Sequence, residues 1–234
     1  MQPGAVVATQ EPVSSLIAQT NLRYVAVEGC IGAGKTALSK MLGELIGGQV
    51  VLEEFDANPF LKDFYRDPER YAFQTQIFFL LTRYKQQKDL LQADLFHRFL
   101  VTDYIFEKDK IFAYLNLQDE ELKLYETLVS SIQHSIVTPD LVIYLQSSVP
   151  RLMQNIKNRG RGYEMEMSKD YIRDLNEAYN YYFFRYKASQ LLIVNAAEMD
   201  FVGDERQFND LVRAIFRPDR AAVEYYNPSK ERKP

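Results

Sequence analysis

The segment Gly29-Cys30-Ile31-Gly32-Ala33-Gly34-Lys35-Thr36 decides the fold, because it matches G-x-x-x-x-G-K-[ST] at every fixed position. The apolar run before it is typical of a strand, and the pattern after it is typical of a helix. Glycines in such a loop let backbone N–H groups converge on a phosphate. We therefore predict a nucleoside triphosphate site in which Lys35 reaches the β- and γ-phosphates and Thr36 binds Mg²⁺. The predicted nucleotide contacts are Gly29, Gly32, Ala33, Gly34, Lys35 and Thr36.

Short runs rich in Val, Ile and Leu recur along the chain, and each has the length of a strand. They lie at 22–28, 49–53, 98–102, 140–145 and 190–194, and segments with helical spacing lie at 68–92, 104–135, 168–188 and 205–216. This alternation predicts an α/β fold of the P-loop NTPase type, with an open parallel five-stranded sheet and helices on both faces. We expect one domain over 22–216, a loosely ordered N-terminal arm over 1–21 and a C-terminal tail over 217–234.

The composition argues against several classes of partner. Lys and Arg number 28 against 32 Asp and Glu, so the net charge of −4 gives no basic excess to attract nucleic acid or an anionic membrane. Cys30 is the single cysteine, which favours a reducing compartment. The first twenty residues lack the basic start and apolar run of a signal peptide, and no apolar run reaches the roughly 18 residues that span a bilayer. We expect a cytoplasmic protein that binds a small molecule.

A phosphate loop serves switches, motors and kinases, so downstream residues must distinguish them. The guanine-reading segment Asn-Lys-x-Asp is absent, and the third apolar run ends in RFLVTDY rather than in consecutive acids. Glu53 and Glu54 end the second run, at the sheet edge where open α/β folds bind ligands. A carboxylate there can accept the proton of an attacking hydroxyl, as a kinase for an alcohol requires. Adjacent glutamates are also common in a solvated turn, so the pair alone leaves both interpretations open.

The segment 53–83, EEFDANPFLKDFYRDPERYAFQTQIFFLLTR, resembles the acceptor half of the deoxynucleoside kinase family. The similarity extends from about Leu22 to Phe216 and keeps the family's order of motifs, from the phosphate loop to an arginine-bearing lid. Asn58-Pro59-Phe60 and Arg159-Gly160-Arg161 look most like segments of bacterial deoxyadenosine and deoxyguanosine kinases. The resemblance implies transfer of the γ-phosphoryl of ATP, with Mg²⁺, to the 5′-hydroxyl of a deoxynucleoside in nucleotide salvage. A purine is favoured.

The resemblance also assigns roles on the acceptor side. Glu53 is implied as the general base, and Tyr65 as the residue that bonds the 3′-hydroxyl and excludes a ribose. Gln76 and Arg83 lie two turns apart on one predicted helix, so both can meet the edge of one base. Asp109 matches a family acid near that arginine. The alternative for Gln76 and Arg83 is the polar stripe of an amphipathic helix.

Further residues are implied near the phosphates. Asp103, directly after the third predicted strand, resembles an acid that supports Mg²⁺, although it also fits a helix N-cap. The segment NIKNRGRGYEMEM is similar to the family's lid, in which Arg159 and Arg161 would close over the transferring phosphoryl group. Glu164 would contact the sugar. Asp200 and Phe201 match the loop that holds the adenine of ATP.

Two positions depart from the family's pattern. Many members carry arginine directly after the acid of the third strand, where this chain has Tyr104. The family also carries a lid arginine four residues before the position of Arg159, and this chain has Asn155 there. Two positive charges expected near the γ-phosphate are therefore absent from these positions, and Lys157 is a candidate to compensate.

Two other functions remain open at this stage. A nucleoside monophosphate kinase would use the same loop but gains little from a base at Glu53. A non-catalytic subunit on the same fold is suggested by the missing arginines, although it has no need of Lys35 and Thr36. Members of the family are usually dimers joined through helices, which implies a homodimer.

Overall fold

In the part of the chain that the structure describes, six parallel strands form one sheet, one more than the five predicted. The computed structural model describes residues 12–93 and 98–228. The strands are β1 (Tyr24–Glu28), β2 (Gln49–Val51), β3 (Leu100–Thr102), β4 (Leu141–Gln146), β5 (Gln190–Asn195) and β6 (Val223–Tyr226). The five predicted runs coincide with β1 to β5, which confirms the predicted parallel α/β arrangement.

The strand order is β2-β3-β1-β4-β5-β6, which places β1 and β4 in the middle of the sheet. Every residue of β1 is buried, as are the first five of β4, because helices cover both faces of a parallel sheet. Tyr24 of β1 pairs with Leu100 of β3, and Val25 pairs with Leu141 of β4. The segments that follow β1, β2 and β3 therefore meet at one edge.

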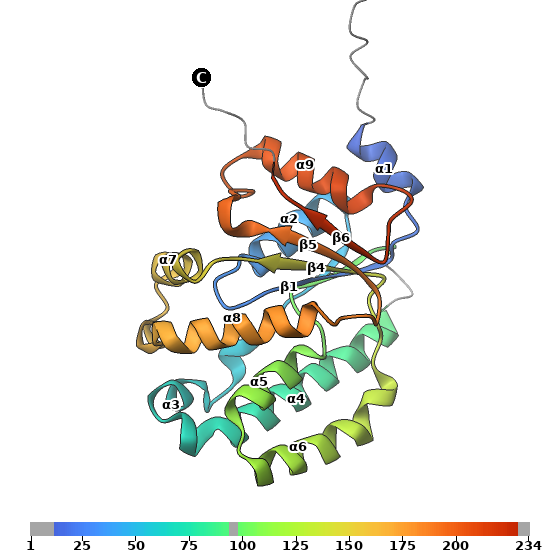
Figure 1. The fold of residues 1–234 in the computed structure, drawn as a ribbon. Coiled ribbons are helices and arrows are strands. Elements are labelled where there is room, and N and C mark those ends of the chain that lie inside the picture. Colours follow the sequence, from blue (N-terminus) through green and yellow to red (C-terminus); the bar gives the residue numbers. More distant parts are fainter. Residues whose placement is uncertain (1–11, 94–97, 229–234) are drawn as a thin grey trace, which may run out of the picture.

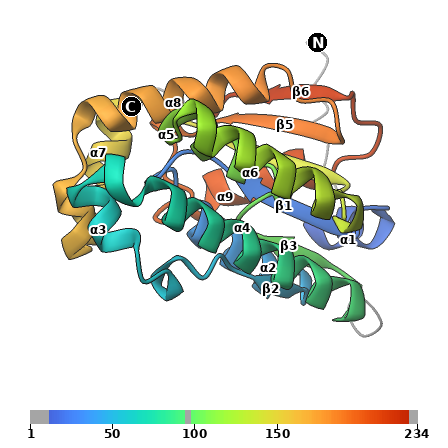
Figure 2. The same cartoon turned by 90° about the horizontal axis from the view of Figure 1, so that it is seen from below.

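Helices cover the two faces of the sheet (Figure 1). They are α1 (Val13–Gln19), α2 (Lys35–Ile46), α3 (Leu61–Arg66), α4 (Pro68–Ala93), α5 (Lys108–Asn116), α6 (Asp119–Ile132), α7 (Val149–Arg159), α8 (Lys169–Phe183) and α9 (Glu205–Phe216). In Figure 1, α1, α2 and α9 lie above the sheet, and α4, α5, α6 and α8 lie below it. Seen from below, these last four helices cover the sheet (Figure 2).

The chain is ordered beyond the boundaries that the sequence suggests. Leu16 of α1 belongs to the main apolar core, and α1 contacts α9, so this part of the expected arm is packed against the domain. Strand β6 pairs with β5 within the expected tail. Residues 1–11 of the arm and 229–234 of the tail lie outside the described residues.

One predicted helical segment is divided. The range 104–135 contains α5 and α6, which are separated at Leu117 and Gln118. Leu117 is extended and ends α5, and three acidic residues in the first turn of α6 favour its start. In the described part of the chain, no helix has the length and apolar character needed to cross a membrane.

Candidate active site

The phosphate loop joins β1 to α2 at the carboxyl edge of the sheet. Gly32 has φ 85° and Gly34 has φ 98°, a region that side chains with a Cβ rarely adopt. A Cβ at Gly32 would also lie 2.7 Å from the carbonyl oxygen of Leu152, so the loop passes too close to α7 for a larger residue. The amine of Lys35 donates to the carbonyls of Gly29 at 2.7 Å and Cys30 at 3.2 Å. It is thereby held across the loop that would receive a phosphate.

Asp103, directly after β3, connects the loop with the segment after β2. Its Oδ2 accepts a hydrogen bond from the Thr36 hydroxyl at 2.6 Å, and its Oδ1 accepts one from the Glu53 N–H at 2.7 Å. The N-cap alternative is excluded, because α5 begins only at Lys108 and follows Glu107. Asp103 therefore fixes the two segments that carry the nucleotide-binding and acceptor-side residues relative to each other.

A fully buried carboxylate on β1, Glu28, connects the start of the phosphate loop with the segment after β3. Its oxygens accept hydrogen bonds from the N–H groups of Gly29 at 2.9 Å and Ile105 at 3.0 Å. Burial raises the pKa of Glu28, and the nearby charges of Lys108 and Lys35 oppose that rise. Sequence reasoning missed this residue, since a single acid at a strand end has many uses.

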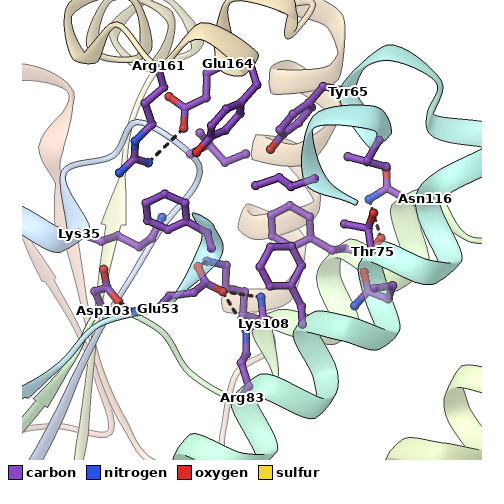
Figure 3. A pocket seen from close by; sticks show the side chains of 18 of the residues that line it. Lys35, Glu53, Tyr65, Thr75, Arg83, Asp103, Lys108, Asn116, Arg161 and Glu164 are labelled. Atoms are coloured by element: carbon purple, nitrogen blue, oxygen red, sulfur yellow. Dashed lines mark hydrogen bonds and ion pairs between the residues drawn. The ribbon is translucent and has the colours of Figure 1, made fainter. Parts of the chain in front are cut away.

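The Glu53 carboxylate is held at both of its oxygens (Figure 3). Arg83 of α4 donates to Oε1 through Nε at 2.9 Å and Nη2 at 2.5 Å, and Lys108 of α5 donates to Oε2 at 2.5 Å. Arg83 also forms an ion pair with Asp109 through Nη1. Two carboxylates and two cations thus form a buried cluster whose formal charges cancel. Glu53 is not in a solvated turn, whereas Glu54 is exposed.

These contacts determine the charge state of the cluster. Burial alone would raise the pKa of Glu53, but Lys108 and Arg83 together lower it to about 2. Burial would likewise lower the pKa of Lys108, but Glu53 and then Glu28 reverse this, and the pKa is raised. Both groups are therefore charged near neutral pH.

A cavity opens above Glu53. Its lining includes Tyr65, Gln76 and Arg83 in addition to Glu53. Gln76 is buried and its amide donates to the Asp109 carbonyl at 2.8 Å, which excludes the alternative of an exposed polar stripe. Asp109 itself lies behind Arg83 and is 1% exposed.

Two more polar residues line the same cavity but were missed by sequence reasoning. Thr75 precedes Gln76 on α4, and Asn116 ends α5; the two side chains lie on the same side of the view in Figure 3. Neither residue belongs to a local motif. Only the approach of α4 to α5 brings them together.

The lid begins where α7 ends at Gly160, whose φ of 69° terminates the helix. Glu164 lies in the short 3-10 helix Gly162–Glu166 and pairs with both arginines, with Arg159 at 2.6 Å and Arg161 at 3.3 Å. The Arg161 guanidinium also lies 3.9 Å from the centre of the Phe55 ring. The lid thus rests on the segment after β2. Glu164, for which the resemblance implies a contact with the sugar, pairs with the two lid arginines in this structure.

A second cavity lies on the other side of the phosphate loop. Its lining includes Gly32, Ala33, Gly34, Asp200 and Phe201, five of the residues that the sequence analysis assigned to the nucleotide. Phe201 is buried and lies so close to Gly34 that a Cβ there would be 2.9 Å from its ring. Four residues line both cavities: Lys35, Thr36, Arg159 and Arg161. The loop and the lid arginines therefore stand between the two spaces.

The structure also shows what occupies the positions that lack arginine. Tyr104 is fully buried, and Asn155 donates to the Gly32 carbonyl at 2.8 Å, which attaches α7 to the phosphate loop. Lys157 is exposed and lines neither cavity, so it does not compensate. Lys108 contacts Glu53 instead, and no sequence signal pointed to it, because the contact spans 55 residues.

Comparison with known proteins now identifies the family. A model described as deoxynucleoside kinase matches residues 25–217. The chain belongs to the deoxynucleoside kinase family. The family resemblance carried by the loop, the acceptor segment and the lid is thereby confirmed, and with it the phosphotransferase class.

Several named proteins are similar to this deoxynucleoside kinase. The deoxyadenosine/deoxycytidine kinase of Bacillus subtilis (strain 168) is 31% identical over 82% of this chain and 90% of its own length. The deoxyguanosine kinase of the same organism is 31% identical over 82% of this chain and 95% of its own length. A deoxyadenosine kinase from M. mycoides with bound dATP has a TM-score of 0.71 and 25% identity, covering 82% of this chain and 98% of that one. This similarity confirms the predicted fold type.

Proposed function

We propose that this kinase transfers the γ-phosphoryl of ATP to the 5′-hydroxyl of a deoxynucleoside, with ATP in the cavity beside Phe201 and the acceptor in the cavity above Glu53. The proposal depends most on one observation: Lys35, Thr36 and the two lid arginines line both cavities. A phosphoryl group that moves from one cavity to the other would pass the cations Lys35, Arg159 and Arg161.

In this proposal, Glu53 receives the proton of the acceptor hydroxyl. The acceptor oxygen forms a bond to the γ-phosphorus while the bond to the β–γ bridging oxygen breaks, and ADP leaves. Lys35 and the lid arginines Arg159 and Arg161 would stabilise the charge on the transferring group. For the arginines to do so, they must give up part of their pairing with Glu164.

Thr36 and Asp103 suit Mg²⁺. Their side-chain oxygens lie 2.6 Å apart beside the phosphate loop, and both are hard oxygen donors. Mg²⁺ in phosphoryl-transfer sites is commonly held by one or two protein oxygens, together with waters and substrate phosphates. Bound there, the ion would neutralise charge on the phosphates.

On the acceptor side, we assign Tyr65 to the 3′-hydroxyl and Gln76 to the edge of the base. Arg83 and Asp109 would support that wall of the site, because Arg83 is already paired with Asp109 and Glu53. Relatives named as deoxyadenosine and deoxyguanosine kinases favour a purine. Deoxycytidine is the main competitor, since one relative is named for both deoxyadenosine and deoxycytidine.

The test is the formation of monophosphate by purified protein from ATP, Mg²⁺ and each of the four deoxynucleosides. We expect the highest kcat/KM for deoxyadenosine or deoxyguanosine. If deoxycytidine or thymidine were preferred by more than about tenfold, the purine assignment would be wrong. If a deoxynucleoside monophosphate outcompeted its nucleoside, the enzyme would be a monophosphate kinase. Failure of calorimetry to detect ATP binding would support a non-catalytic subunit.

We also propose a cytoplasmic homodimer. Tyr114 of α5 and Tyr181 of α8 are exposed aromatic side chains on neighbouring helices, which suits a helical subunit contact. The single cysteine, Cys30, is buried and consistent with a reducing compartment. Light scattering at micromolar concentration tests the dimer directly.

A further inference from the structure

Lys108 is a buried cation on the acceptor side of the site. It is the first residue of α5, it is 5% exposed, and it lines the cavity above Glu53. Its amine lies 2.5 Å from Oε2 of Glu53, and 5.8 Å from the centre of the Phe112 ring. A buried lysine is retained at a cost, because removing its charge from water is unfavourable unless a partner compensates. Glu53 is that partner.

The other cations discussed above have different sets of partners. Lys35 donates to carbonyls of the phosphate loop, and Arg159 and Arg161 pair with Glu164. Arg83 divides its donors between Glu53 and Asp109. Among the described residues that line the cavity, Lys108 is therefore the cation whose ion pair is with Glu53 alone.

Two contacts from two helices fix the plane of the Glu53 carboxylate. Arg83 on α4 donates hydrogen bonds to Oε1, and Lys108 on α5 donates one to Oε2. With only one of these partners, the carboxylate could turn about its side-chain bonds, as exposed glutamates do. A base must lie within hydrogen-bond reach of the proton that it receives, so its orientation contributes directly to the rate.

We propose that Lys108 is a positioning residue that orients Glu53 toward the acceptor hydroxyl, and that it supplies from α5 the positive charge that Tyr104 does not. This proposal rests on the proposed role of Glu53 as general base. Tyr104 is fully buried in the segment before α5, whereas Lys108, four residues further along the chain, reaches the cavity. An ammonium on a flexible stem has three donors, so Lys108 can keep its hydrogen bond to Oε2 of Glu53 while the acceptor hydroxyl of the deoxynucleoside approaches.

The test is a double-mutant cycle between Lys108→Met and Glu53→Gln, with kcat and deoxynucleoside Kd measured for all four proteins. In the Glu53 enzyme, Lys108→Met should lower kcat on the order of 10²-fold, as expected for a misplaced catalytic group, and change Kd only a few-fold. In the Glu53→Gln background, the same substitution should change kcat by less than about threefold, because the group that it orients is gone. Equal losses of kcat in both backgrounds would overturn the proposal, since Lys108 would then act independently of Glu53.

Matched variants complete the experiment. Lys108→Arg keeps a donor and a charge and should recover at least tenfold of the loss, which a purely structural role would not predict. Lys110→Met makes the same change on the same helix, away from both cavities, and should keep wild-type kcat and Kd.

If Lys108→Met does not give a folded protein by circular dichroism, Lys108→Gln enters the same cycle with the same expected outcomes. Glu53→Gln alone reports on the base assignment, and wild-type turnover reports on the kinase function, so each failure is distinguishable. Full activity of Glu53→Gln would overturn the base assignment and the proposal together.

Discussion

Thr36 and Asp103 are joined by a hydrogen bond of 2.6 Å from the Thr36 hydroxyl to Oδ2 of Asp103. The bond joins the start of α2 to the residue directly after β3, and 66 positions of the sequence lie between the two residues. The second oxygen of Asp103 accepts the Glu53 N–H, so one carboxylate connects the phosphate loop to the proposed base.

Asp103→Asn should weaken the enzyme's use of Mg²⁺. The amide keeps one oxygen but loses the charge that favours a divalent cation, so the Mg²⁺ concentration for half-maximal rate should rise about 10–100-fold. The measurement is the initial rate against free Mg²⁺ at saturating ATP. Asp119→Asn on the exposed start of α6 should leave the curve unchanged. An unaltered Mg²⁺ dependence in Asp103→Asn would remove Asp103 from the metal site.

Tyr65→Phe tests the contact with the sugar. Loss of one hydrogen bond to the 3′-hydroxyl should lower kcat/KM for deoxyadenosine by about tenfold. The same variant should act on 2′,3′-dideoxyadenosine as the wild type does, because that substrate has no 3′-hydroxyl to lose. Tyr71→Phe, one helix further on and outside the cavity lining, serves as the control. Equal losses on both substrates would show that Tyr65 acts only through packing, such as its stacking on Tyr163.

The cluster around Glu53 predicts a dependence of stability on pH. The folded-state pKa of Glu53 is lowered from 4.5 to about 2, so its contribution to stability is present above pH 4.5 and is lost as the pH falls toward 2. Between about pH 6 and about pH 3.5, the melting temperature of Glu53→Gln should therefore fall less than that of the wild type. Glu54→Gln, at the exposed neighbour, should keep the wild-type slope. Parallel curves for all three proteins would contradict the ion pairs with Arg83 and Lys108.

The phosphate loop and most of the sheet could be predicted, because each is indicated by a pattern of consecutive residues. The glycine spacing reports a local backbone requirement, and the runs that form β1 to β5 are apolar because those strands are buried or, in β2, half-buried. Strand β6 was missed, since VEYY at 223–226 alternates between exposed and half-buried positions at a sheet edge and has no continuous apolar run. The division between α5 and α6 was also missed, although the acidic residues after Gln118 were a usable signal.

The site residues also divide into those that a local motif predicts and those that it does not. Glu53, Gln76 and Arg83 could be proposed from a segment with a recognisable order of motifs, and the structure places all three at one cavity. Lys108 and Glu28 could not, because each acts through partners that are distant in sequence. A lysine at the start of a helix is ordinarily exposed, and only the packing of α5 against α4 turns this one inward.

The most direct test of the account is single-turnover phosphoryl transfer from ATP to deoxyadenosine or deoxyguanosine, whichever the wild type prefers, by wild type, Glu53→Gln and Glu54→Gln. Deoxynucleoside Kd is measured for the same three proteins. We predict that Glu53→Gln slows transfer on the order of 10²-fold or more while Kd stays within a few-fold, and that Glu54→Gln changes neither. Wild-type transfer by Glu53→Gln, or a comparable loss in Glu54→Gln, would contradict the assignment of Glu53 as the base.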